Sequence, residues 1–188
     1  MKRTLLITFL FASIINCQAQ LDIKINPLGL LFSNPDASVE FSPAKNFAFE
    51  PFVGISYVKT QFGLPSYTSK GLTYGVTGKY YFAPVRGFDK LYTGAYFSRG
   101  EIKYTGVGLR SNEVFSNVFE AVGLAVGYKW VLPRNFVFDL STGLGKKIRN
   151  TYENVGNSNF NLDNVKPSDV DYVLRLGIGY RFRANQKE

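Results

Sequence analysis

The chain has 188 residues, with 22 Lys and Arg against 14 Asp and Glu, and it contains no histidine. This length fits one domain with a single core or one small barrel. The 16% aromatic content and 18 glycines, without helix-forming runs of Ala, Leu and Glu, favour an all-β chain over a helical one. No run of Lys and Arg is long enough to indicate nucleic-acid binding, so we expect no nucleic-acid partner.

The first residues have the pattern of an export signal. Lys2 and Arg3 precede the apolar run Leu5–Ile15, which is shorter than the roughly 20 apolar residues of a transmembrane helix. We therefore predict a signal peptide over residues 1–19, cleaved after Ala19, and one domain over residues 20–188. A lipoprotein signal acylated at Cys17 is the alternative, although the preceding asparagine is larger than such signals prefer.

Eight segments follow in which apolar residues alternate with polar residues or glycine, as in half-buried β-strands. In the first segment, Pro27 and Gly29 interrupt the alternation, which predicts a bulge or a strand end there. The predicted strands are Leu21–Leu31, Ala37–Ser42, Phe47–Val58, Gly71–Phe82, Leu91–Lys103, Asn117–Trp130, Phe136–Lys147 and Asp171–Phe182.

The fifth segment has the least regular alternation. Its charged residues Arg99, Glu101 and Lys103 share one side of the strand. If charges face the interior of a barrel, Tyr92 and Tyr96 belong to the opposite, lipid-facing side.

The connections between the segments alternate in predicted length. Those after the second, fourth and sixth strands are short, whereas Lys59–Lys70, Tyr104–Ser116 and Ile148–Asp169 are long and polar. Outer-membrane barrels have short periplasmic turns and longer external loops, so we expect these three segments outside the cell and both termini inside. Aromatic residues gather beside the short turns, as in the aromatic girdles of membrane interfaces.

The last segment, DYVLRLGIGYRF, has a wholly apolar side and ends with a recognisable pattern. Arg175, Gly177, Tyr180 and Phe182 form a sequence that resembles the closing-strand signal of bacterial outer-membrane β-barrels, which the outer-membrane assembly machinery reads. Across the mature chain the strand pattern resembles the small eight-stranded barrels, such as the transmembrane domain of outer membrane protein A and its single-domain relatives.

This resemblance implies an all-β, eight-stranded antiparallel up-and-down transmembrane β-barrel in the bacterial outer membrane. Outer-membrane lipid and the assembly machinery are the partners that it implies. Alternation alone also permits a soluble β-sandwich or a lipocalin-like barrel, and the latter would place apolar residues inside and polar residues outside.

An eight-stranded barrel is only wide enough to be filled by side chains or to hold one small ligand. We therefore expect an interaction scaffold with a plugged lumen that presents its loops to an envelope or extracellular partner. A narrow pore or a small-ligand transporter is the alternative. The enzyme families found among barrels of this size use a histidine as the general base. The absence of histidine therefore argues against an enzyme.

We expect no cofactor. Without histidine or a cysteine in the mature chain there is no transition-metal site. Calcium among Asp163, Asp169 and Asp171 is the one metal site that the acidic residues suggest.

The inward positions of the predicted strands carry charges of both signs, which predicts a network inside the lumen. Antiparallel neighbours give the pairs Lys24–Glu40, Glu50–Lys79, Lys129–Asp139 and Arg181–Asp22, because an unpaired buried charge would be costly. The residues expected in this network are Lys24, Glu40, Glu50, Lys79, Lys129, Asp139, Arg175 and Arg181. Six inward glycines are expected to leave room for these long side chains: Gly123, Gly127, Gly143, Gly145, Gly177 and Gly179.

The closing-strand pattern generates a prediction about assembly. Replacing the terminal aromatic residue, Phe182→Asp, should strongly lower the amount of folded, heat-modifiable protein in outer-membrane fractions. Gel mobility of unheated against heated samples measures this amount. Unchanged levels would contradict the proposed role of the last strand.

Overall fold

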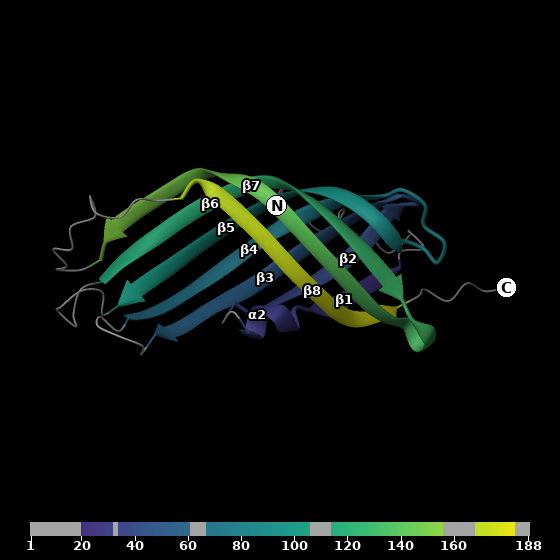
Figure 1. The fold of residues 1–188 in the computed structure, drawn as a ribbon, viewed down its shortest axis with the longest axis horizontal. Helices are drawn as coiled ribbons and strands as arrows, with labels where there is room; N and C mark the ends of the chain where they lie inside the picture. Colours follow the sequence, from purple (N-terminus) through teal and green to yellow (C-terminus); the bar gives the residue numbers. More distant parts are fainter. Residues whose placement is uncertain (1–19, 32–33, 61–66, 106–113, 156–167, 183–188) are drawn as a thin grey trace, which may run out of the picture.

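The computed structural model describes residues 20–31, 34–60, 67–105, 114–155 and 168–182. Within them, eight strands form a closed barrel in which each strand pairs with the next and the last returns to the first (Figure 1). The strands are β1 Leu21–Ile25, β2 Asp36–Ala44, β3 Phe47–Thr60, β4 Tyr67–Tyr81, β5 Lys90–Thr105, β6 Val114–Val131, β7 Phe136–Asn154 and β8 Val170–Phe182. All pairs are antiparallel, which confirms the predicted eight-stranded up-and-down barrel.

Two short helical segments accompany the strands, α2 at Pro27–Leu31 and a 3₁₀ turn at Pro133–Asn135. The predicted first strand, Leu21–Leu31, therefore ends early, at Ile25. Proline has no N–H for strand pairing and its fixed φ suits the first position of a helix, which is where Pro27 lies. The described residues contain no helix with the length and hydrophobicity that crossing a membrane requires.

The two ends of the barrel differ. We call the end with residues 44–47, 82–89 and 132–135 the turn end, and the end where β3, β5 and β7 finish the loop end; in Figure 1 they lie at the right and the left. The expected alternation of short and long connections fails in one place, because the turn-end connection 82–89 spans as many residues as the loop-end connection 106–113. The expected signal peptide and most of the expected external loops lie outside the described residues.

The outward face of the barrel carries a band without charged residues that starts at the turn end. It covers residues 47–57 of β3, 72–80 of β4, 91–97 of β5, 122–130 of β6, 136–144 of β7 and 172–182 of β8. On five strands the next outward position toward the loop end is charged: Lys59, Lys70, Arg99, Glu120 and Lys146. A tilted transmembrane strand needs about 9–11 residues, and the band has about this length on most strands.

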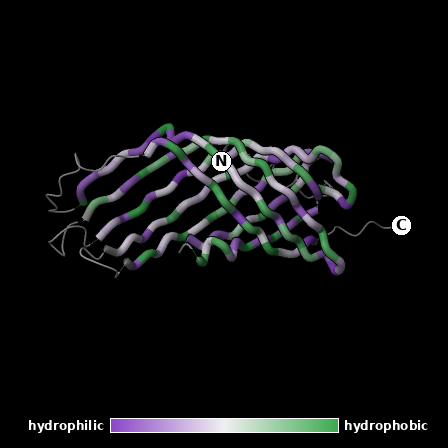
Figure 2. Tube along the Cα trace, viewed as in Figure 1, coloured by the Kyte–Doolittle hydropathy of each residue, from purple (hydrophilic) through white to green (hydrophobic). Residues whose placement is uncertain are grey.

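The inward face is polar, so residues of opposite character alternate along the strands (Figure 2). Aspartate, glutamate, lysine and serine side chains are buried in the interior, whereas exposed Ile, Leu, Val and aromatic side chains cover the outside. This arrangement is the reverse of the lipocalin-like alternative, which would have an apolar interior.

The predicted orientation of the fifth strand is wrong. Tyr92 and Tyr96 face inward, with exposed fractions of 1% and 6%, whereas the side chains of Glu101 and Lys103 are more than half exposed on the outside. The strands continue beyond the uncharged band toward the loop end, and there charged residues occupy the outward side as well. Charge therefore indicates the inward side only within the band.

The same extension explains why the predicted strands are too short at the loop end. β7 continues to Asn154 and β6 begins at Val114, within segments expected to be loops. Where both faces of a hairpin are wet, polar residues occupy both sides and the alternation that marks a strand disappears.

The inward glycines of β6 and β7 accommodate tyrosine rings. A Cβ atom at Gly127 would overlap the ring of Tyr92, and one at Gly123 or Gly145 would overlap the ring or hydroxyl of Tyr96. The expectation that the glycines make room for charged side chains holds at Gly177, where a Cβ would lie 3.2 Å from Cδ of Lys24.

This packing predicts different effects for two additions to the same face of β6. Gly127→Val should lower the free energy of unfolding by about 1–3 kcal/mol, because overpacking against a buried ring displaces it. Ala125→Val, two residues away on the same side, adds methyl groups toward a cavity and should cost less. Urea unfolding of both variants measures the difference, and equal losses would contradict the role of Gly127.

Candidate functional site

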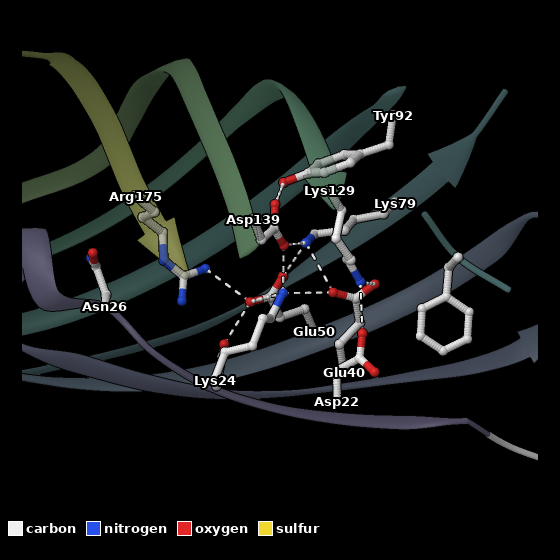
Figure 3. A network of polar contacts seen from close by, with 12 residues as sticks. Asp22, Lys24, Asn26, Glu40, Glu50, Lys79, Tyr92, Lys129, Asp139 and Arg175 are labelled. Atoms are coloured by element: carbon white, nitrogen blue, oxygen red, sulfur yellow. Dashed lines mark hydrogen bonds and ion pairs between the residues drawn. The ribbon is translucent and has the colours of Figure 1, made fainter. Parts of the chain in front are cut away.

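Buried charged residues cross the lumen in the turn-end half of the barrel. Eight of them have exposed fractions of 3% or less: Asp22, Lys24, Glu40, Glu50, Lys79, Lys129, Asp139 and Arg181. On the loop side, Arg175 lies 3.5 Å from Glu50 and donates a hydrogen bond of 2.5 Å to Asp36, so these two residues adjoin the eight. We call these ten residues the lumen network; it contains five cations and five anions, and much of it is visible in Figure 3.

The loop-side layer of the network consists of two lysines among three carboxylates. Lys24 Nζ lies 2.6 Å from Glu40 Oε2, 3.0 Å from Glu50 Oε1 and 2.5 Å from Asp139 Oδ2. Lys79 Nζ lies 3.1 Å from Glu40 and 2.8 Å from Asp139, and it also contacts Glu50. The two ammonium groups therefore share the same three carboxylates, which is how this many buried charges can be tolerated.

Hydroxyl groups complete the hydrogen bonding of these carboxylates. Tyr92 Oη donates to Asp139 at 2.7 Å, Tyr81 Oη donates to Glu40 at 2.6 Å, and Ser38 Oγ donates to Glu50 at 2.6 Å. Each hydroxyl belongs to a different strand from the carboxylate that it contacts. The network consequently links opposite walls of the barrel.

The turn-side layer is centred on Asp22 of β1. Arg181 donates two hydrogen bonds to this carboxylate, at 2.7 and 2.8 Å. Lys129 Nζ lies 3.0 Å from Asp22 and 2.5 Å from Glu40, so it joins the two layers.

The structure brings together three of the four predicted pairs: Lys24 with Glu40, Glu50 with Lys79, and Arg181 with Asp22. Lys129 and Asp139 are register partners, as the sequence suggested, but their charged groups bind elsewhere. Lys129 extends to Glu40 and Asp22, while Asp139 receives Lys24 and Lys79 from across the lumen. Strand register identifies neighbours along the wall, but it does not identify partners across the interior.

The connection at residues 82–89 folds over the turn-side layer, a feature that the sequence did not indicate. Phe88 is 3% exposed, and its ring centroid lies 4.7 Å from the Arg181 guanidinium and 4.8 Å from Lys129 Nζ. Arg181 also donates to the backbone carbonyls of Arg86 and Phe88. The positive φ of 86° at Gly87 allows the chain to make this turn.

On the loop side, the network forms the floor of a cavity of about 630 Å³. Glu50, Lys79, Asp139 and Tyr92 line the floor, and Arg175 lines the wall. The Arg175 guanidinium lies 3.5 Å from Glu50 and 4.8 Å from the ring centroid of Phe52. The cavity therefore ends at the network.

Three carboxylates of the network are near enough to one another to suggest a metal site. Those of Glu40, Glu50 and Asp139 lie within 4.8 Å of one another, but the ammonium groups of Lys24, Lys79 and Lys129 already pair with them. Of the residues expected to bind calcium, Asp163 lies outside the described residues, and Asp171 accepts a hydrogen bond of 2.8 Å from Tyr96.

The residues of the proposed assembly signal lie along β8. Arg175 and Gly177 face inward, while Tyr180 and Phe182 face outward at the turn end. The rings of Tyr180 and Phe182 meet edge to face with centroids 5.0 Å apart, and Phe182 is the register partner of Leu21 on β1. Tyr180 and Phe182 therefore lie at the seam where the barrel closes, whereas Arg175 and Gly177 lie on the part of β8 beyond its pairing with β1.

The sharing of Lys24 by three acids generates a prediction. Lys24→Met should lower the free energy of unfolding by about 3–5 kcal/mol, because it removes one of the two ammonium groups that three buried carboxylates share. The same substitution at Lys103, whose side chain is exposed and lies 3.9 Å from Glu101, should cost no more than about 1 kcal/mol. Urea titration of both variants measures the two values, and similar losses would mean that the network contributes little.

Comparison with known proteins places the chain in a family. A solved structure described as a major outer membrane protein from Thermus thermophilus has a similar fold, with a TM-score of 0.52 and 15% sequence identity over 87% of this chain and 98% of that chain. No curated protein sequence matches the chain. The family model described as "Protein of unknown function (DUF3575)" matches residues 4–180. The chain therefore belongs to the DUF3575 family, with the fold of an outer-membrane β-barrel.

Proposed function

We propose that this protein is an integral barrel of the bacterial outer membrane whose lumen is plugged, and that it acts as a scaffold presenting its loop end to a partner. The observation that carries the proposal is the lumen network, because it crosses the turn-end half of the barrel from wall to wall with paired charges.

The outward face supports the membrane location. Its uncharged band suits the roughly 25 Å apolar zone of outer-membrane barrels. Aromatic side chains mark the turn-end edge of this band, among them Phe47, Tyr80, Trp130, Phe136 and Phe182, all more than a third exposed. Aromatic rings are enriched at the interface between the apolar zone of a membrane and water.

The opposite edge of the band supports the same location and an orientation. Lys59, Lys70 and Lys146 lie on the outward face just beyond it. At this height, basic side chains would face the phosphate groups of outer-membrane lipid, with which they pair favourably. The loop end would then face the exterior and the turn end the periplasm, in agreement with the expectation that both termini lie inside.

Two successive layers support a closed lumen. An ion entering from the loop end would meet the layer of Lys24, Lys79 and Glu50 and then the layer of Lys129 and Asp22. Beyond the second layer, the buried ring of Phe88 covers the turn end. Because an eight-stranded barrel has little interior space beyond its own side chains, no continuous water path is expected.

The scaffold role follows from the closed interior. A barrel that passes no solute can still hold segments at the cell surface in fixed positions. We expect a partner in the envelope or outside the cell to bind the connections at the loop end, and crosslinking from residues 155–169 in intact cells would identify it. We expect no enzymatic activity, because the chain has no histidine and the network carboxylates are held by cations.

The cavity favours a second candidate, a carrier of one small ligand. Its volume of about 630 Å³ lies within the range of about 300–1,000 Å³ found for small-molecule sites. A narrow pore is less favoured, because the cavity ends at the network.

The plug predicts an order of conductance. In planar bilayers the wild-type barrel should be silent, Glu50→Ala should leak slightly and lose a few kcal/mol of stability, and the combined variant of Glu40, Glu50, Lys79 and Lys129 to alanine should conduct in steady steps. The combined variant removes two anions and two cations, so the net charge of the network is kept.

Heat-modifiable mobility of each variant provides the control for folding. If the folded wild-type barrel itself conducts steadily, the plug hypothesis is wrong and the narrow-pore alternative gains. The same conclusion follows if the folded four-residue variant stays silent.

A further inference from the structure

The wall of the barrel is incomplete on the loop side of β1 and β2. β1 pairs with β8 only over residues 178–182, and β2 reaches no further along β3 than the pair Asp36–Gly54. Within the described part of the chain, residues 170–177 of β8 and 56–60 of β3 therefore pair with a strand on one side only. We call the gap between these two strand segments the notch.

The helix α2 lies at the lower edge of the notch, about midway along the barrel (Figure 1). It packs against β8, and the Asn26 side chain accepts a hydrogen bond of 3.1 Å from the backbone N–H of Leu176. Leu30 and Leu31 of α2 are 64% and 78% exposed. The helix thus takes the place of strand pairing there and presents leucines to the surroundings.

The cavity reaches the notch. Four residues whose side chains belong to the outward face also line the cavity: Ile25, Ile55, Tyr172 and Leu174. The inward neighbours Val173 and Arg175 line it as well. Since both faces of β8 border one space, that space opens sideways through the wall as well as along the barrel.

The notch overlaps the loop-side part of the uncharged band. Tyr57 on its β3 edge and Tyr172 and Leu174 on its β8 edge are outward band residues, whereas Lys59, also on its β3 edge, lies beyond the band toward the loop end. In the proposed orientation, the notch faces the outer leaflet of the membrane. Molecules arriving there come from lipid.

The chemistry of the cavity changes with depth. Apolar residues surround the notch, while the interior carries the hydroxyl groups of Ser38, Thr77, Ser98 and Ser141 above the charged floor. The charges at the floor are already matched, as for Lys79 with Asp139 and Arg175 with Asp36. A ligand bearing its own charge would disturb these pairs, whereas an uncharged hydrogen-bonding group would not.

We propose that the notch admits a single-chain amphiphile with an uncharged polar end from the outer leaflet, and that the cavity binds the polar end while the chain extends through the notch into lipid. This inference rests on the proposed membrane location. A long-chain alcohol is the simplest molecule of this class.

The test uses the folded protein in phosphatidylcholine vesicles and a hexadecanol that carries a diazirine beside its hydroxyl group. Light should attach the probe to inward residues that line the cavity, such as Val173, and excess hexadecanol should compete. Filling the cavity with Val173→Trp should lower this labelling about tenfold, which corresponds to losing the burial of about two methylene groups. Thr73→Trp fills the cavity from β4, in case the first variant does not fold.

The matched control is Leu124→Trp, which adds the same ring to the outward face of β6 away from the notch and should label like the wild type. Labelling confined to outward band residues, or equal in Val173→Trp and Leu124→Trp, would overturn the proposal. Stronger labelling by the corresponding alkane, carboxylate or amine probe would overturn the assignment of an uncharged polar end.

Failure of this inference can be distinguished from failure of the proposed function. A barrel that inserts, shows heat-modifiable mobility and remains electrically silent, yet takes up no probe, contradicts only the amphiphile site. A chain that does not insert into vesicles contradicts the membrane location itself.

Discussion

The matching of buried charges constrains the whole barrel. An unpaired ion in this interior would be very costly, so each inward lysine and arginine needs carboxylates at a fixed distance. The charged groups of the network come from seven of the eight strands, and β5 adds the Tyr92 hydroxyl. Strand register, barrel width and inward side-chain length are therefore interdependent. A strand displaced by one residue would send its charged side chain to the apolar outward face and leave its partners unmatched.

The fold could be predicted from the sequence because its rule is local. Within the uncharged band, side chains alternate between two very different surroundings, and period two is visible in strands such as β6 and β8 without knowledge of any partner. This alternation disappears where the two faces of a strand have similar surroundings. Beyond the band both faces carry polar residues, and for this reason the sequence pattern does not reveal the orientation of β5 or the true length of β7.

The sequence predicted which charged residues belong to the candidate site, but it predicted only some of the contacts among them. The inward charges follow from alternation, and neighbours along the wall follow from antiparallel pairing. The contacts of Lys129 with Asp22 and of Lys24 with Asp139 join strands that are not adjacent, so they depend on how far side chains reach across a narrow interior. The covering of the turn end by Phe88 depends on a loop conformation, and the notch depends on a strand that Pro27 ends early. No periodic pattern encodes either feature.

The shortness of β1 has a consequence for how the ring is sealed. Its five residues, Leu21–Ile25, supply the whole seam with β8, whereas β5 with β6 and β6 with β7 share many more register positions. With so few backbone hydrogen bonds, this seam would be the easiest place for the barrel to open or for two strands to pair in the wrong register. Two of these five residues, Asp22 and Lys24, carry charges whose partners lie on β2, β3, β6, β7 and β8. The first strand therefore has two roles. Its few backbone hydrogen bonds close the barrel, and the ion pairs of Asp22 and Lys24 form in only one strand register.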